Sequence, residues 1–281
     1  MLPVWIIEEA VLRALAEDVG SGDLTTEALV DDGATVVAVI HSKEAGVLAG
    51  LPVAECVFQI LDAGVVFEGL LPDGSDLEPG SKIARVRGDG RALLTGERTA
   101  LNFLRHLSGV ATATRRLAGL IAGTGGRLVD TRKTTPGLRA LEKYAVRVGG
   151  GHNHRTGLFD GILIKDNHIK LAGGVTAAVR RAREAAPHTV RVEVEVESLA
   201  QFQEALQAGA DLILLDNMPD DLLREAVKLA GGRALLEASG NIDAANIRAV
   251  AETGVDLISV GAITHSAPAL DISMDVEEIE R

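Results

Sequence analysis

The sequence predicts an α/β protein in which a small α+β domain is followed by an open, incomplete parallel α/β barrel. After Gly126, apolar strand-like runs alternate with helical stretches, a rhythm typical of parallel sheets. The segment AGADLILLDN (208–217) resembles TGVDLISVGA (253–262), which indicates repeated βα units. The six candidate strands are fewer than the eight of a closed barrel, so we expect an open one. A doubly wound sheet would also give this pattern.

The first part of the chain mixes helices with antiparallel-looking strands. The spacing of apolar residues over Ile6–Glu17 predicts a helix with its apolar side chains on one side. A short second helix follows, and either Asp23 or Thr25 is positioned to cap it. A long helical region over Arg91–Ala122 is predicted to be interrupted at Ser108-Gly109. The other predicted elements are strands at Thr35–His41, Val65–Leu70 and Lys82–Arg87, a short apolar segment at Val47–Leu51 and a helix over Pro52–Ala63.

The second part contains the alternating elements. The predicted strands are Leu128–Arg132, Ile162–Lys165, Val190–Val196, Leu212–Asp216, Ala234–Glu237 and Leu257–Val260. The predicted helices between them are Leu138–Val148, Val175–Ala186, Leu199–Ala208, Leu222–Ala230 and Ala244–Glu252.

Composition excludes several classes of protein. Of the 281 residues, 47% are hydrophobic, enough for a full core, and only 2% are aromatic, too few for stacking single-stranded nucleic acid. The net charge of −12 argues against broad binding to a phosphate backbone. The single cysteine, Cys56, excludes an internal disulfide and a cysteine-based zinc site. Without a long apolar run or a signal-peptide pattern, we expect a soluble, cytoplasmic protein with no nucleic-acid or membrane partner.

Basic charge is concentrated between Arg132 and Lys170. This span contains eight Lys or Arg and three acidic residues, against the overall acidity of the chain. A local excess of cations is typical of an anion site, although a basic face paired with acids elsewhere would give the same count. Arg132 and Lys133 directly follow one apolar run and Lys165 follows another. This placement favours a site, because α/β proteins put functional groups at strand ends.

Polar residues or glycines follow every candidate strand of the second part. Because the carboxyl ends of barrel strands converge on one mouth, we expect these residues to form a single active site. They are Arg132-Lys133, Lys165, Glu195, Asp216, Ser239-Gly240-Asn241 and Gly261-Ala262.

The residue types predict what this mouth binds. EASGNI (237–242) and SVGAITHS (259–266) combine small residues with helix starts, which frees backbone N–H groups for a phosphate, although ordinary turns look similar. Glu195 and Asp216 would hold Mg²⁺ or ribose hydroxyls. Glu193 or Glu197 could replace Glu195, since alternate residues share a strand face. Guanidinium and ammonium groups suit a small dicarboxylate. The candidates for that role are Arg98, Arg132, Arg155, Lys133 and Lys165.

Several motifs together resemble the quinolinate phosphoribosyltransferase family, the decarboxylating nicotinate-nucleotide pyrophosphorylases of NAD synthesis. The most specific are DTRKTTPGLRALEKYAVRVGGGHNHR and LIKDNHI. The resemblance covers nearly the whole chain through EDVGSGDLTT, GERTALNFLRHLSGVAT, LLDN, EASGN and SVGAITHS. It implies a homodimer, with higher assembly left open. Each subunit would have an N-terminal α+β sandwich domain (1–105), to which residues 267–281 return, and a barrel domain (106–266).

The resemblance also implies roles for the site residues. Quinolinate would be bound by Arg98 from the partner subunit and by Thr131, Arg132, Lys133, His154, Arg155 and Lys165. Phosphoribosyl pyrophosphate would be bound by Lys165, Glu195, Asp216, Ser239, Gly240, Asn241, Val260, Gly261 and Ala262. Catalysis would depend on Lys133, Lys165, Glu195 and Asp216, and the last two are the candidate Mg²⁺ ligands. The common phosphoribosyltransferase motif of two acids and a Thr/Gly-rich loop is not evident, which indicates a separate structural class.

Three other functions fit parts of this pattern. Lys165 at a strand end would suit a Schiff-base aldolase, although such an enzyme does not need so many arginines. A relative of the family that serves molybdenum transport, or a noncatalytic anion-binding regulator, would share the fold. The intact arginine set favours the enzyme that converts quinolinate and phosphoribosyl pyrophosphate into nicotinate mononucleotide, pyrophosphate and CO₂.

Overall fold

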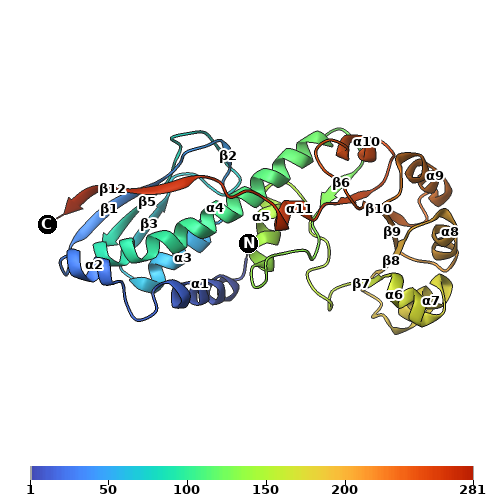
Figure 1. Ribbon diagram of the computed structural model, residues 1–281, viewed down its shortest axis with the longest axis horizontal. Helices are drawn as coiled ribbons and strands as arrows, with labels where there is room; N and C mark the ends of the chain where they lie inside the picture. The colour runs from blue at the N-terminus through green and yellow to red at the C-terminus, as the bar shows by residue number, and fades with distance from the viewer. Residues whose placement is uncertain (1, 281) are drawn as a thin grey trace. The chain divides into compact units, whose positions relative to one another are not determined.

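The computed structural model describes residues 2–280, which divide into two compact units (Figure 1). The first unit contains residues 2–115, 135–150 and 266–280, and the second contains 116–134 and 151–265. The sequence places the domain boundary at residue 105. In the structure this position lies inside one continuous helix, and residues 135–150 cluster with the first unit instead of the barrel. One reason is a hydrogen bond of 2.6 Å from the Tyr144 hydroxyl to Asp73 in that unit.

The first unit contains a four-stranded antiparallel sheet in the order β12-β1-β5-β3. Its strands are β1 (Thr35–Ser42), β3 (Val66–Gly69), β5 (Lys82–Asp89) and β12 (Ile272–Glu280), and a small ribbon pairs β2 (Gly46–Val47) with β4 (Asp76–Leu77). Its helices are α1 (Val4–Asp18), α2 (Leu24–Leu29), α3 (Leu51–Leu61), most of α4 (Gly90–Leu120) and α5 (Arg139–Val148).

Most predicted elements of the first unit are confirmed to within a few residues. Of the two candidate caps for α2, the structure selects Asp23, whose carboxylate accepts the backbone N–H of Thr26 at 3.0 Å. Strand β12 was not predicted. It lies beside β1 along the whole of that strand, red next to blue in Figure 1.

The predicted interruption of α4 at Ser108-Gly109 is wrong. Both residues are small because other segments pack closely against them, not because the helix ends there. The Ser108 hydroxyl accepts the Ala49 N–H at 3.0 Å, and a Cβ on Gly109 would overlap the carbonyl oxygen of Pro268. The glycine therefore lets the C-terminal segment cross the helix on its way to β12.

Replacing Gly109 by alanine is expected to lower the free energy of unfolding by roughly 1–3 kcal/mol, because the added methyl group overpacks this crossing. Gly119→Ala is the matched control in the same helix, since apart from the neighbouring helix backbone no atom of the described residues lies within 4 Å of the added methyl. Alanine is the better helix former, so this control should gain up to about 1 kcal/mol. Urea denaturation of both variants measures the difference, and equal stabilities would show that the crossing does not require glycine.

The second unit is built on a six-stranded parallel sheet in the order β6-β11-β10-β9-β8-β7. Strands β7 to β11 follow one another in chain order, as in a barrel, whereas a doubly wound sheet reverses direction partway. The edges are β6 and β7, so the predicted open barrel is confirmed. The strands are β6 (Arg127–Val129), β7 (Ile162–Ile164), β8 (Val192–Val196), β9 (Leu212–Asp216), β10 (Leu235–Ser239) and β11 (Leu257–Ser259).

Helices follow the strands and cover the outer side of this sheet in Figure 1. They are α6 (Asp166–Ala172), α7 (Val175–Ala185), α8 (Leu199–Gln207), α9 (Asp220–Ala230) and α10 (Ile247–Ala251). The short helix α11 (Ala262–His265) follows β11 and is not part of this outer row in Figure 1. The sequence did not predict the short helices α6 and α11. It also extended α10 too far at its start, where the Asn246 side chain accepts the Asp243 N–H and fixes a turn.

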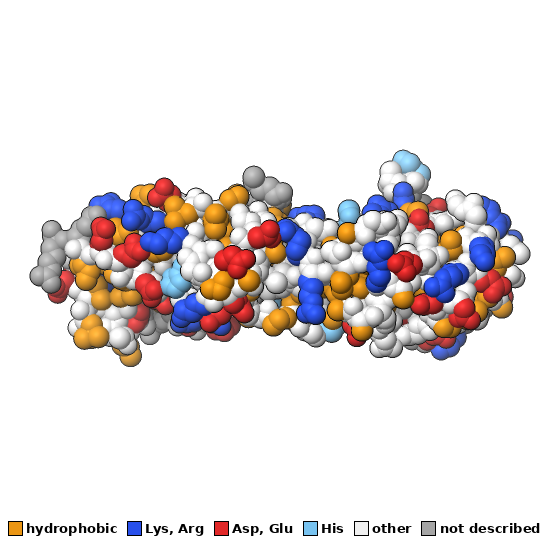
Figure 2. All heavy atoms as spheres, turned by 90° about the horizontal axis from the view of Figure 1, so that it is seen from above, with side chains coloured by type: hydrophobic (Ala, Val, Ile, Leu, Met, Phe, Trp, Pro, Cys, Tyr) orange, Lys and Arg blue, Asp and Glu red, His pale blue; other side chains and the backbone are white. Residues whose placement is uncertain are grey.

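Charged side chains of both signs are interspersed on the face shown in Figure 2, so the net charge of −12 does not form a single acidic surface there. Within residues 2–280, no helix combines the length and the apolar character needed to cross a membrane.

Candidate active site

A cavity of about 510 Å³ lies in the second unit at the carboxyl ends of the parallel strands. It brings together most of the residues that the sequence singled out. These are Thr131, Arg132, Lys133, His154, Arg155, Lys165, Glu195, Asp216, Ser239, Gly240 and Asn241. The lining also includes residues that the sequence analysis did not select, namely Leu163, Leu214, Asn217, Glu237 and Ser259.

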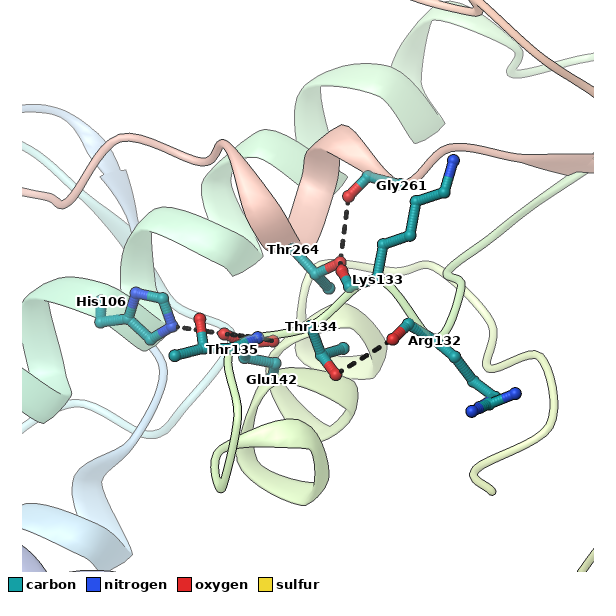
Figure 3. Close-up of polar contacts among 8 residues, drawn as sticks. All are labelled: His106, Arg132, Lys133, Thr134, Thr135, Glu142, Gly261 and Thr264. Atoms are coloured by element: carbon teal, nitrogen blue, oxygen red, sulfur yellow. Dashed lines mark hydrogen bonds and ion pairs between the residues drawn. The ribbon is translucent and has the colours of Figure 1, made fainter. Parts of the chain in front are cut away.

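The loop after β6 presents Thr131, Arg132 and Lys133 to the cavity. The Thr264 hydroxyl of α11 lies 2.7 Å from the carbonyl oxygen of Lys133 and 3.0 Å from that of Gly261 (Figure 3). A Cβ on Gly261 would lie only 3.1 Å from Cδ of Lys133. Gly261 therefore leaves room for the aliphatic part of the Lys133 side chain. This packing role is separate from the phosphate contact that the sequence predicts for Gly261.

Just beyond this loop the chain enters the first unit at Thr135. The Thr135 N–H donates to a carboxylate oxygen of Glu142 at 3.1 Å. Glu142 is fully buried and also lies 2.8 Å from Nε2 of His106 (Figure 3). Because a buried carboxylate needs such partners, this pair holds the segment in one conformation.

Lys165 stands where β7 ends and α6 begins. Its backbone N–H donates to Nδ1 of His168 at 2.9 Å, which fixes the first turn of the helix. Its ammonium lies 3.1 Å from a carboxylate oxygen of Glu195 on the neighbouring strand β8. The half-exposed lysine is thus held over the cavity as a cation.

His154 is oriented by its backbone neighbours. The buried carboxylate of Asp130 accepts the His154 N–H at 2.8 Å and the Asn153 side-chain amide at 2.6 Å. The Arg155 N–H donates to Nδ1 of His154 at 2.7 Å, so the ring proton of the neutral imidazole is on Nε2. That nitrogen lies 2.9 Å from Glu193.

Two buried acids lie next to His154. Glu237 was not selected from the sequence, and Glu193 was considered there only as an alternative to Glu195. Glu237 has no exposed surface, and Glu193 is 5% exposed. Nε2 of His154 is 3.7 Å from Glu237, compared with 2.9 Å from Glu193. Burial, followed by the negative charge of Glu193, raises the pKa of Glu237 to about 7. Their signal in the sequence was an acid inside an apolar strand, in VEVEV and LLEAS.

Each of the two arginines of the cavity has a hydrogen-bond donor that no acceptor in the described part of the chain uses. Nε of Arg132 and Nε of Arg155 are buried and lack a partner among the described residues. Burial, followed by the charge of Arg132, lowers the pKa of Arg155 from its usual value. Since buried donors without partners are costly, this arrangement favours an anionic ligand that would satisfy them.

The ends of β9 and β10 form a polar corner of the cavity. The Asn241 amide donates to the Asn217 side chain at 2.9 Å, and the Asn217 amide donates to Asp216 at 2.9 Å. Asn217 and Asn241 both have left-handed backbone conformations, with φ of 52° and 51°. A Cβ on Gly240 would overlap the Asn217 side chain, so this corner requires glycine.

Glu195 and Asp216 also fit the predicted magnesium site. They stand on the neighbouring strands β8 and β9 and both line the cavity. Mg²⁺ in phosphate-handling sites is bound by one or two carboxylates, waters and substrate phosphates. Two carboxylates at the cavity wall match this donor set.

Four predicted residues lie outside the cavity lining. Val260, Gly261 and Ala262 directly follow β11, next to the lining residue Ser259. Arg98 belongs to the first unit, on α4, where its side chain is 57% exposed and lies 3.9 Å from Glu97. The ligand contacts assigned to all of the predicted site residues stay predictions, and for these four the cavity lining adds no support.

The cavity defines a class of protein: a parallel-barrel enzyme that binds small, multiply charged anions. Four Arg or Lys side chains face carboxylates at the carboxyl ends of the strands, where barrel enzymes carry their active sites. Family comparison narrows the class. Residues 23–108 match the quinolinate phosphoribosyl transferase N-terminal domain, and residues 110–275 match the C-terminal domain. The chain belongs to the quinolinate phosphoribosyl transferase family, as its motifs indicated.

Individual relatives agree with this assignment. The probable nicotinate-nucleotide pyrophosphorylase (carboxylating) of Bacillus subtilis is 46% identical over 260 residues, covering 92% of this chain and 90% of that protein. The Mycobacterium leprae nicotinate-nucleotide pyrophosphorylase (carboxylating) is 45% identical over 276 residues, or 95% and 96% of the two chains. The structure of the nicotinate-nucleotide pyrophosphorylase from Francisella tularensis superposes with a TM-score of 0.94 at 43% identity, covering 99% and 98%.

Proposed function

We propose that this protein transfers the phosphoribosyl group of phosphoribosyl pyrophosphate to quinolinate and decarboxylates the product. The products are nicotinate mononucleotide, pyrophosphate and CO₂, as in de novo NAD synthesis. The observation that carries the proposal is the cavity itself, in which Arg132 and Arg155 hold unpartnered buried donors beside Lys133 and Lys165. Family membership favours this reaction over the aldolase, the molybdenum-transport protein and the anion-binding regulator.

In the proposed reaction, the cationic side chains bind the two carboxylates and fix the ring of quinolinate. The pyridine nitrogen attacks the anomeric carbon, the bond from that carbon to pyrophosphate breaks, and charge of an oxocarbenium type develops on the ribose. Positioning and electrostatic stabilisation would supply most of the rate. When the 2-carboxylate then leaves as CO₂, the electron pair of the broken bond stays on C2, where the positive charge of the resulting pyridinium stabilises it. This carbanion takes a proton from solvent, which gives nicotinate mononucleotide.

The acidic side of the cavity would serve the phosphoribosyl group. Glu195 and Asp216 would bind ribose hydroxyls or Mg²⁺, which would neutralise pyrophosphate charge when bound. The 5′-phosphate would be held by the small residues after β10 and β11, where backbone N–H groups are available. Those residues are Ser239, Gly240, Asn241, Val260, Gly261 and Ala262.

The assembly and location remain part of the proposal. We propose a homodimer in which Arg98 of each subunit completes the quinolinate site of the other, with higher assembly left open. Its exposed position on α4, where it lies 3.9 Å from Glu97, is compatible with a contact to another subunit. The proposed location is the cytoplasm.

Asp216→Asn is expected to raise the KM for phosphoribosyl pyrophosphate at least about tenfold, which is roughly 1.4 kcal/mol, while quinolinate affinity changes little. The physical reason is that Asp216 faces the predicted ribose and metal side of the cavity. Steady-state kinetics and calorimetry with quinolinate alone measure the two effects. Asp221→Asn, at an exposed position on the following helix, is the control. A large loss of quinolinate binding in Asp216→Asn would mean that the acid serves the other ligand.

A further inference from the structure

Glu237 lies between two cavities of the barrel. The first is the active-site cavity at the carboxyl ends of the strands. The second, of about 310 Å³, is lined by residues at the opposite strand ends, among them Arg127, Arg191 and Leu257. Among residues 2–280, three line both cavities, namely Glu237, His154 and Arg155. Glu237 therefore faces the ligand site on one side and a separate space on the other.

The carboxylate of Glu237 is only weakly compensated: His154 and Ser259 favour its ionised form, but burial and the charge of Glu193 outweigh them. Both of its oxygens lack a hydrogen-bond partner among residues 2–280. Nε2 of His154 lies 3.7 Å from Glu237 but 2.9 Å from Glu193, and the Arg155 N–H on the other ring nitrogen fixes the ring in this position. An ionised Glu237 would thus be a second buried negative charge beside Glu193, an arrangement that is costly in a protein interior.

The polar and charged groups that act on Glu237 come from several elements around it, whereas its partner on the neighbouring strand β9 is the apolar Leu214. These groups are Glu193 on β8, His154 and Asp130 in the loops beside β6, and Ser259 on β11. Arg155 is close enough to Glu193 to interact with its charge and is itself repelled by Arg132. The ligand atoms of His154, Glu193 and Glu237 lie within 4.8 Å of one another. With two guanidinium groups already nearby, a shared proton suits this cluster better than a divalent cation.

We propose that Glu237 acts as a neutral acid at the floor of the active site and takes up a proton when the dianionic ligand binds. This inference rests on the proposed function, because quinolinate supplies the two negative charges. Their arrival above Glu237 further disfavours its ionised form. The proton would come from water in the second cavity, which stays available when the ligand fills the first. No covalent bond of the ligand changes, and one proton passes from solvent to the carboxylate.

The direction of the pH dependence follows from the acid's own equilibrium. The pKa of Glu237 in the free protein is about 7, raised by burial and by Glu193. Above this value the free protein has an ionised Glu237 and must gain a proton on binding. Below it the proton is already present. Because of this group, the dissociation constant for quinolinate should therefore increase about tenfold from pH 6 to pH 8, which means weaker binding at the higher pH.

Calorimetry with quinolinate tests whether Glu237 takes up a proton when the ligand binds. At each pH, titrations in two phosphate-free buffers whose ionisation enthalpies differ, such as Mes and Bis-Tris at pH 6 and Hepes and Tris at pH 8, count the protons taken up. We expect about 0.9 proton at pH 8 and about 0.1 at pH 6. In Glu237→Gln, a neutral isostere, the uptake and the tenfold pH dependence should disappear while quinolinate still binds. Quinolinate binding with no uptake at pH 8, or with the same uptake in Glu237→Gln, would overturn the proposal and leave the proposed function intact.

A second measurement keeps the two hypotheses separate. Infrared difference spectra of the free protein between pH 6 and pH 8 should show the carbonyl band of a buried protonated carboxyl group, and this band should be missing in Glu237→Gln. If quinolinate failed to bind at any pH, the proposed function would fall, and with it the ligand-linked uptake. A wild-type protein without the band at pH 6 would overturn the neutral acid directly, even if the variant could not be purified.

Discussion

Replacing quinolinate by nicotinate as the substrate is expected to lower kcat/KM by roughly 30- to 5,000-fold. Nicotinate lacks the 2-carboxylate, so guanidinium groups that this carboxylate would satisfy remain desolvated and without a partner. Losing one side of such a charged contact costs about 2–5 kcal/mol, which converts to the stated range. Arg132 and Arg155 already have buried Nε donors without partners among the described residues, and they are the source of this penalty.

The measurement is a comparison of kcat/KM for the two acids with phosphoribosyl pyrophosphate held at saturation. The same enzyme serves for both substrates, so stability and expression cannot affect the ratio. Comparable values for the two acids would contradict the assignment of the cationic cavity to a dicarboxylate.

A mixture of two inactive variants is expected to recover up to about a quarter of wild-type activity. The variants are Arg98→Ala, which would deprive the partner's site of a guanidinium, and Lys165→Ala, which deprives its own site of an ammonium. In a mixed dimer one site then carries both defects and the other carries neither. Under random exchange half of the dimers are mixed, and half of their sites are intact.

The control for this experiment is a mixture of Arg132→Ala with Lys165→Ala. Both of these side chains line the cavity of their own subunit, so every site in a mixed dimer carries one defect. No recovery is expected there, although exchange is equally complete. If the Arg98→Ala mixture also stayed inactive despite proven exchange, Arg98 would act in its own subunit or outside the reaction.

The sequence was informative about the barrel because its signals are local. An apolar run followed by a polar residue predicts both a strand and its functional end, and the barrel rule brings these ends together. Lys165, Glu195 and Asp216 were found in this way, and all of them line one cavity. The family resemblance added His154 and Thr131, for which periodicity alone gave no role.

The features that the sequence did not predict depend on distant neighbours. Ser108-Gly109 looked like a helix break, because the segment that crosses there, at Pro268, is remote in the chain. Strand β12 is rich in acids and is specified by its pairing with β1. In the sequence, Glu237 looked like an ordinary strand residue. Its proposed role in the site became visible only from its burial beside Glu193 and His154.

The most direct test of the proposed function uses quinolinate labelled with ¹³C in the 2-carboxylate. With phosphoribosyl pyrophosphate and Mg²⁺, the purified protein should release labelled CO₂, pyrophosphate and unlabelled nicotinate mononucleotide in equal amounts. Omission of either substrate should abolish all three products. A mononucleotide that retained the label, or CO₂ released without phosphoribosyl pyrophosphate, would contradict the proposed order of transfer and decarboxylation. No product from the complete mixture would contradict the function itself.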